Sequence, residues 1–462
     1  MNKCLFTEKG GWLRHVRLLN FAILCLLLTL AGCKHNADPD VTPEGRSAAD
    51  FNADVALQWS QMHLDLIRST AGFTPPVAAR SLGYGGLTLY EAVVPGVNGN
   101  RSLAGQLNGL ATLPKPESGT YHWPASANAA QAQILRGLFA NTSEANKKRI
   151  DSLETTLQSQ YRREAGEDVA NRSAAFGKAV AEAIFAWSKT DRGHEGYLRN
   201  FPADYAVPVR PGNWQPTENG RPPMQPFWGS NRTFLAVNAA MPIPEPIPYS
   251  ADVRSQYFAQ YLEVYTKNRA LTQEEKEIAV WWADDPSETF TPPGHSYNLA
   301  RIAIQSRKAN LAEAAEALAR TGIAVADAFI LCWRCKYTHF NERPYTFVRR
   351  AIDPAWVPFW PAPPFPGFVS GHATQSAAAV TVLESVFGEN FSFIDNSHVS
   401  RTRDAVRKVD FKARSFGSLW EAAEESAYSR FLGGIHTRQD NDTGLREGRK
   451  IGRNINALSW RN

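Results

Sequence analysis

Helical periodicity runs along most of this chain, and sustained two-residue alternation of apolar and polar residues is almost absent. In the segment that begins at Ser47, apolar residues recur every three or four positions until Gly72 and the two prolines that follow. The same period continues over 77–94, 125–140, 143–161, 165–188, 251–266, 273–284, 297–306, 309–339, 373–388 and 418–432. This pattern predicts an all-α fold of two packed helical bundles, with the chemistry in the second.

Residues 1–33 have the features of an export signal. A basic stretch precedes the apolar run Phe21–Ala31, which is too short to span a bilayer as a helix. The run ends in Leu30-Ala31-Gly32-Cys33, which resembles a bacterial lipobox with Cys33 as the lipidated residue; an ordinary secretory cleavage site is the alternative. No later segment has about 18 consecutive apolar residues. We therefore expect an exported bacterial lipoprotein, anchored only by its lipid on the periplasmic or cell-surface side of a membrane.

The remaining composition narrows the function classes. The first 33 residues hold four Lys/Arg and one Glu, so the formal charge of +5 falls to about +2 without them and gives no argument for nucleic-acid binding. Only Cys332 and Cys335 lie outside the export segment, and one C-x-x-C pair is at most half of a zinc site. A local disulfide and two packed thiols on a buried helix both remain open.

Four regions follow one another along the chain. After the signal at 1–33, residues 34–50 are polar and suit a flexible tether. Residues 51–235 form an N-terminal helical region, and the Pro- and Gly-rich stretch at 200–250 breaks the helical rhythm as a connector or a wrap around the site. Residues 236–462 form the expected catalytic domain.

Three short strings in the last third of the chain carry the functional information. Together they supply cations, imidazoles, a carboxylate and a Ser flanked by Gly, which is the inventory needed to hold a tetrahedral oxyanion such as phosphate or vanadate. The strings are Lys336-x6-Arg343-Pro344, Ser370-Gly371-His372 and Ser429-Arg430-x5-His436-x3-Asp440.

The spacing within each string suggests how it is placed. Lys336 and Arg343 are close to two helical turns apart and are expected on one helix face, with Pro344 discouraging further helix. Ser370 and Gly371 precede a helix of small residues, so they are expected at a helix N-terminus, where free N–H groups favour an anion.

The third string interrupts a helix at Gly433-Gly434, so His436 is expected on a loop just beyond it. Asp440 lies one helical turn later. Its carboxylate can accept from one imidazole nitrogen and thereby fix the tautomer of the other.

The ordered set resembles the signature of the vanadium-dependent haloperoxidase and type 2 phosphatidic acid phosphatase superfamily, whose soluble members are α-helical bundle proteins. One position departs from the family pattern, because Val369 stands where Pro usually precedes the Ser. The resemblance assigns oxyanion binding, of vanadate or phosphate, to Lys336, Arg343, Ser370, Gly371 and Arg430.

The resemblance also assigns the reacting groups. His436 corresponds to the residue bonded axially to vanadium, or to the nucleophile in the phosphatases, and Asp440 orients it. His372 corresponds to the general acid/base.

Three further residues extend the likeness toward the haloperoxidases. Trp333 and Phe365 stand at offsets that resemble the aromatic residues lining the halide side in fungal chloroperoxidases, although an aromatic near any site often only packs. Asp285, in Trp282-Ala283-Asp284-Asp285, corresponds to an Asp that pairs with the vanadate-site Arg, here Arg430. His295 and His339 are expected to be structural.

Three functions fit these residues. The first is a vanadate-dependent haloperoxidase that uses hydrogen peroxide to oxidise bromide or iodide, with chloride as a further candidate. The second is an acid phosphatase of the same superfamily, which hydrolyses phosphate esters through a phosphohistidine and needs no vanadate. The third is a lipoprotein that binds phosphate without turnover, which an intact His372 and His436–Asp440 pair argue against. A membrane lipid phosphatase is disfavoured because those relatives have several transmembrane helices.

Overall fold

The long helix α11 (Leu311–His339) is the element around which the fold is built. The computed structural model describes residues 45–217 and 220–462, so the export signal and Cys33 lie outside the described residues. Asn310 caps α11 through a reciprocal pair of bonds with Glu313, and most of the helix is buried. A Cβ added to Gly322 would lie 2.2 Å from the carbonyl oxygen of Leu82, so this glycine allows α11 to pack closely against α3 (Pro75–Glu91).

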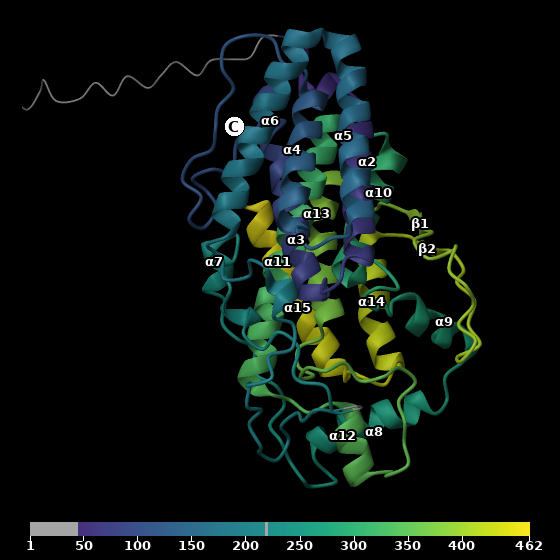
Figure 1. Cartoon of the computed structure of the whole chain (residues 1–462). Helices are drawn as coiled ribbons and strands as arrows, with labels where there is room; N and C mark the ends of the chain where they lie inside the picture. The colour runs from purple at the N-terminus through teal and green to yellow at the C-terminus, as the bar shows by residue number, and fades with distance from the viewer. Residues whose placement is uncertain (1–44, 218–219) are drawn as a thin grey trace, which may run out of the picture. The chain divides into compact units, whose positions relative to one another are not determined.

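The first half of the chain supplies one group of helices. Tyr84 and Trp123 are among its largest fully buried side chains. In this group α4 packs against α6, α5 and α3 (Figure 1). Its elements are η1 (Ala48–Asp50), α2 (Asp54–Ser69), α3, η2 (Val94–Gly96), α4 (Trp123–Leu138), α5 (Glu144–Ala165), α6 (Glu167–Ser188) and η3 (Gly196–Leu198). Because Ser47 caps η1 and Ala48 is buried, folded structure begins within the expected 34–50 tether.

The second half packs α13 against α11, α14 and α15. A two-stranded antiparallel ribbon of β1 and β2 precedes α14. The elements are η5 (Trp228–Ser230), α7 (Ala236–Ala239), α8 (Gln256–Asn268), α9 (Gln273–Trp281), α10 (Thr291–Arg307), α11, α12 (Pro344–Ala351), α13 (Gly371–Phe387), β1 (Phe393–Asp395), β2 (Arg414–Phe416), α14 (Leu419–Leu432) and α15 (Arg438–Asn456). The all-α prediction is confirmed.

The described residues, 45–217 and 220–462, form one compact unit, and the expected boundary at 235/236 stays a prediction. Within the described ranges, no helix is long and apolar enough to cross a bilayer. Cys332 and Cys335 are free thiols buried on α11, which is the second of the two alternatives left open for them.

One local expectation is wrong. Lys336 and Arg343 do not share a helix face, because α11 ends at His339 and Phe340 turns the chain with a left-handed φ of 53°. Arg343 is instead the N-cap residue of α12, and Pro344 is the first residue of that helix. Proline suits this position because its missing N–H is one that a helix start leaves unpaired.

Candidate active site

The N-terminus of α13 provides the backbone of the site. Ser370 is the N-cap residue, and its hydroxyl accepts from the backbone N–H of Ala373. The backbone N–H of Ser370 donates to the carbonyl of Asp440 at 3.0 Å, which joins the second string to the third. Gly371 borders a cavity. A Cβ added to it would meet no atom closer than 3.8 Å, so a side chain at this position would fit but would take up space in the cavity.

Lys336 lies beneath the loop that leads into this helix. Its Nζ donates to the carbonyl oxygens of Pro366, Gly367 and Val369 at 2.8, 2.7 and 2.6 Å. Burial lowers the pKa of Lys336 to about 8. All three ammonium protons therefore hold the loop, and the expected contact of Lys336 with an oxyanion stays a prediction.

Arg343 connects this loop to the third string. Its Nε donates to the carbonyl of Phe365 at 3.0 Å, and its Nη1 lies 2.8 Å from the carbonyl of Ile435 and 2.9 Å from His436 Nε2. Its Nη2 is buried and has no hydrogen-bond partner among the described residues. Burial lowers the pKa of Arg343 to about 9, and the guanidinium keeps its charge at neutral pH.

His436 is held in one tautomer. Its Nδ1 lies 2.8 Å from Asp440 Oδ2, and Asp440 is fixed in turn by a capping box with Thr437 at the start of α15. Because the carboxylate accepts from Nδ1–H while Arg343 donates to Nε2, the Nε2 atom carries a lone pair. Burial and the charges of Arg343 and Lys336 hold the pKa of His436 well below its usual value. His436 is therefore a neutral imidazole with its lone pair on Nε2.

The second imidazole is held by a backbone carbonyl. His372 Nε2 lies 2.8 Å from the oxygen of Trp282, which can only accept, so Nε2 carries the proton and Nδ1 is left as a base. Burial and the nearby charge of Arg430 keep the pKa of His372 well below its usual value.

Arg430 shares that carbonyl. Its Nη1 donates to Trp282 O at 3.2 Å, and its buried Nε has no hydrogen-bond partner in the part of the chain that the structure describes. The expected ion pair with Asp285 is not formed, since no Asp285–Arg430 contact of 4.0 Å or less occurs among the described ion pairs. Burial raises the pKa of Asp285 to about 6 although the charge of Arg430 opposes the shift.

Two hollows meet at these residues. His372, His436 and Arg430 border a cavity of about 40 Å³, together with Trp333 and Phe365. His372, Arg430 and Phe365 also border a wider cleft of about 540 Å³. The first half of the chain contributes to both through Pro75. The cleft gives small molecules access to His372, and the smaller cavity, which shares His372, Arg430 and Phe365 with the cleft, borders His436.

Trp333 and Phe365 form one wall of the smaller cavity. Their rings lie 5.0 Å apart, centroid to centroid, and the indole N–H of Trp333 donates to Met224 O at 3.2 Å. The guanidinium of Arg343 lies 4.9 Å from the ring centroid of Phe365. The pair therefore packs and also presents an apolar face to the cavity, and its place on the halide side stays a prediction.

The sequence did not reveal that the backbone carbonyl of Trp282 is part of the site, because a backbone acceptor has no side-chain signature. It also did not reveal that His295, expected to be structural, belongs to a buried cluster beside this carbonyl. His339 is outside the site and lies 2.9 Å from the carbonyl of Pro244.

Two buried guanidinium nitrogens without a hydrogen-bond acceptor among the described residues indicate that this site suits an oxyanion. A buried N–H without an acceptor costs about 1–3 kcal/mol, and more when the group is charged. Arg343 Nη2 and Arg430 Nε are two such donors; Arg343 contacts His436 Nε2 through its Nη1, and Arg430 borders the same cavity as His436. An anion in this cavity could accept from Arg430 and from the first turn of α13, with Arg343 adjacent through its contact with His436.

Known proteins resemble the chain over most of its length. A family model described as the VCPO second helical-bundle domain matches residues 316–459. The vanadium chloroperoxidase of Curvularia inaequalis is 24% identical over 498 residues, which cover 87% of this chain and 81% of the relative. A solved bacterial vanadium-dependent iodoperoxidase is 31% identical with a TM-score of 0.77, over 89% of this chain and 97% of the other. A solved holo-type bacterial vanadium-dependent chloroperoxidase shares the fold, with 14% identity and a TM-score of 0.64 over 84% of this chain and 92% of that one.

Proposed function

Since the chain belongs to the vanadium haloperoxidase superfamily, we propose that it is a vanadate-dependent enzyme that uses hydrogen peroxide to oxidise halide. Iodide and bromide are the proposed substrates, with chloride as a further candidate. The observation that carries the proposal is the neutral His436, fixed by Asp440 and close to two buried guanidinium groups, each with an N–H that has no partner among the described residues.

The chain has a residue for each part of the cofactor. His436 Nε2 would bind the vanadium, and Arg343 and Arg430 would neutralise the oxyanion oxygens, with Ser370 and Gly371 at the α13 N-terminus. Bound vanadate would supply a Lewis acid that activates peroxide toward a halide, and the vanadium would keep its oxidation state.

The two imidazoles divide the remaining work. Asp440 accepts from His436 Nδ1–H and so keeps the lone pair on Nε2, which would bind vanadium in place of the hydrogen bond that Arg343 Nη1 donates to it in this structure. His372 keeps its proton on Nε2 against Trp282 O, so its Nδ1 is the base that takes a proton from an incoming acid and returns it to a leaving oxygen. Both groups are neutral at pH 7 because burial and the adjacent cations depress their pKa values.

The halide side is proposed to lie at Trp333 and Phe365. Halides such as iodide are weakly hydrated, and an oxidised halogen is protected from water by an apolar wall. A phosphomonoesterase needs polar contacts for its leaving group instead. A phosphatase remains the second candidate, because the two unpaired guanidinium N–H groups suit phosphate as well as vanadate.

One pair of assays separates the candidates. Protein loaded with orthovanadate is given hydrogen peroxide with iodide or bromide, and the vanadium-free protein is given an activated aryl phosphate, with His436→Ala as the inactive control in both. We expect halide oxidation by the loaded protein and only slow ester hydrolysis by the vanadium-free protein. Fast ester hydrolysis with no halide oxidation would show a phosphatase. Oxyanion binding without either reaction would show a binding protein.

A further inference from the structure

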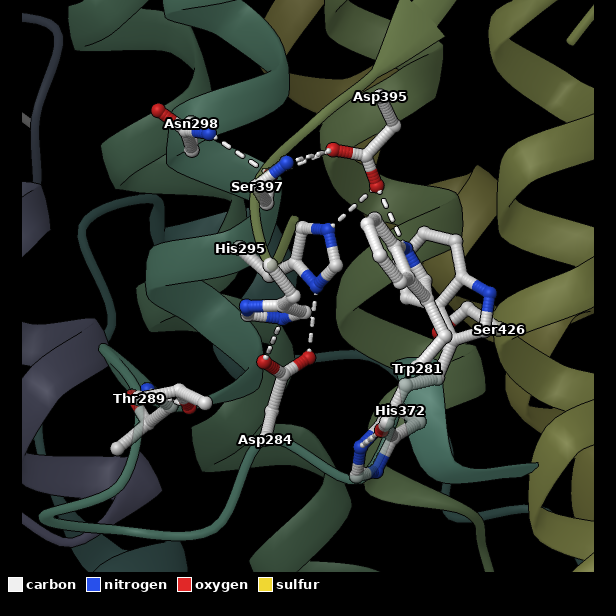
Figure 2. Close-up of polar contacts among 12 residues, drawn as sticks. Trp281, Asp284, Thr289, His295, Asn298, His372, Asp395, Ser397 and Ser426 are labelled. Carbon is white, nitrogen blue, oxygen red and sulfur yellow. Dashed lines mark hydrogen bonds and ion pairs between the residues drawn. The ribbon is translucent and has the colours of Figure 1, made fainter. Parts of the chain in front are cut away.

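A chain of four buried side chains lies next to the site without bordering the smaller cavity. Asp395 Oδ2 lies 2.8 Å from His295 Nε2, and His295 Nδ1 lies 2.8 Å from Asp284 Oδ2 (Figure 2). The other oxygen of Asp284 lies 2.9 Å from His398 Nε2. We call these four residues, Asp395, His295, Asp284 and His398, the relay.

Both ring nitrogens of His295 face carboxylates, and carboxylates only accept. The imidazole can therefore satisfy both partners only when it carries two protons and a positive charge. Burial alone would lower the pKa of His295, but Asp284 and Asp395 outweigh burial and raise it to about 10. The charge of His295 in turn outweighs the burial of Asp395 and lowers its pKa to about 2.

The relay is attached to the carbonyl that both site residues share. Asp284 lies two positions after Trp282 and has a left-handed φ of 52°, so its side-chain bonds fix an unusual turn of the backbone. The ring of His295 also stacks on the indole of Trp282, with centroids 4.4 Å apart and an interplanar angle of 21°. Trp282 O then accepts from His372 Nε2 and Arg430 Nη1.

The relay joins three separate parts of the chain at this turn. His295 comes from α10, Asp395 from β1, and His398 from the segment after β1. Asp395 is itself held by the indole N–H of Trp281 at 2.8 Å and by the hydroxyl of Ser397 at 2.5 Å. The turn is therefore anchored by side chains that do not border the small cavity, which is the arrangement expected of a support for reactive groups.

We propose that the relay is a positioning device, which holds the turn at Trp282 so that one carbonyl fixes both the tautomer of His372 and the orientation of Arg430. Its members are positioning residues: none of them borders the smaller cavity, and only Asp284 borders the wider cleft. The proposal rests on the proposed function only for the roles of His372 and Arg430.

The alternative interpretation of this cluster is that it binds a metal cation. Asp284, His295 and His398 offer ligand atoms that lie within 4.8 Å of one another. Each side-chain N and O of Asp284, His295 and Asp395 already has a partner within the described chain, and the imidazolium supplies the positive charge that a metal would bring. We therefore assign a proton, and not a metal, to the centre of the relay.

The first test is spectroscopic and needs no vanadium. In protein labelled with ¹⁵N-histidine, the imidazole identified by its loss in His295→Gln should show both nitrogens protonated at pH 8, where an ordinary histidine is neutral. Titration of His295 near pH 6.5 would overturn the relay. So would a stoichiometric divalent metal in the purified protein that is lost in His295→Gln.

The second test measures binding of inorganic phosphate and of orthovanadate. His295→Gln and Asp284→Asn should weaken both by roughly tenfold, the low end of the range for residues that support ligating groups, and should shift the ¹⁵N signal of His372. Ser397→Ala, which removes one bond to Asp395, should act in the same direction more weakly and serves if the buried variants do not fold.

Asp191→Asn is the matched control, because Asp191 is also a buried carboxylate in an ion pair, with Arg80 at 2.7 Å, and borders neither hollow. It should lower the melting temperature without changing oxyanion affinity or the His372 signal. Relay variants that behave like this control would show a merely structural cluster. Since these measurements do not involve halide, a protein that fails to oxidise halide would refute the proposed function and leave the relay standing.

Discussion

Replacing Arg430 by Lys tests the site most directly, because it keeps the charge and removes the planar fork of donors. Arg430 is buried, donates to Trp282 O from Nη1, and has an unpaired Nε. A lysine ammonium at this position can reach the place of either Nη1 or Nε, but it cannot occupy both places at once. The variant should therefore lose one charge-assisted hydrogen bond to the anion.

Such a bond contributes about 1.5–3 kcal/mol, so the dissociation constant should rise roughly 10- to 150-fold. Arg430→Ala removes the charge as well and should bind more weakly still. At a ligand concentration 100 times the wild-type Kd, the oxyanion stabilises the wild type by about 2.7 kcal/mol. A variant with thirtyfold weaker affinity gains only about 0.9 kcal/mol at that concentration.

Equilibrium binding of orthovanadate, with phosphate as competitor, gives the affinity, and thermal unfolding with and without ligand gives the stabilisation. Arg438→Lys is the matched control, since Arg438 lies at the start of α15 but pairs at the surface with Glu263. The reasoning is refuted if Arg430→Lys binds within threefold of the wild type, or if it binds more weakly than Arg430→Ala.

Four other outcomes follow from the structure. His436→Ala should abolish oxyanion binding with the fold intact, whereas His372→Ala should keep the affinity and lose roughly 10²–10⁴-fold in rate; equal loss of binding in both would contradict the division of roles. Phe365→His should change the preference among iodide, bromide and chloride more than any phosphatase rate, and unchanged halide ratios in competition assays would remove the residue from the halide side. The folded-state pKa of His295 is about 10 against 6.5 for an ordinary histidine, so its contribution to stability is fully present below about pH 6 and is lost as pH rises through 10. Urea unfolding should then show the deficit of His295→Gln shrinking from pH 6 to pH 10, and a constant deficit would argue against the charged imidazole. If Cys33 is lipidated, mass spectrometry of the mature protein should find it as a modified N-terminus, and a free amine at another residue would exclude this.

The helices that the sequence predicted are those with an apolar stripe. The helix α15 was not predicted: it is amphipathic, but its buried face is built on glycines and has only Ile451 and Ile455 as large apolar residues. Gly444, Gly448 and Gly452 pack on α13, and a Cβ added to Gly448 would lie 2.1 Å from the oxygen of Thr374. Glycine normally disfavours a helix interior, so its use here as a close-packing seam depends on a partner that local sequence cannot reveal.

The site shows the same division between local and distant information. Ser370 at the start of α13 and the His436–Asp440 pair follow from spacing along the chain, and the structure places them as the sequence predicted. The side chain of Lys336 was predictable, but its three carbonyl partners were not, because they depend on how the loop at 366–369 folds back over α11.

Charge explains why these groups belong together. Three cations, Lys336, Arg343 and Arg430, are buried near the two imidazoles. Within the described chain, the only carboxylate hydrogen-bonded to one of these imidazoles is Asp440, on His436. Burial and the excess positive charge depress the pKa values of His372 and His436, so both are neutral, as the proposed ligand and the proposed base must be. An anion entering the cavity reduces that excess, so the pKa of His372 rises when the site is filled. Anion binding thus prepares His372 to accept a proton, and the Trp282 carbonyl, by holding Nε2–H, directs that proton to Nδ1.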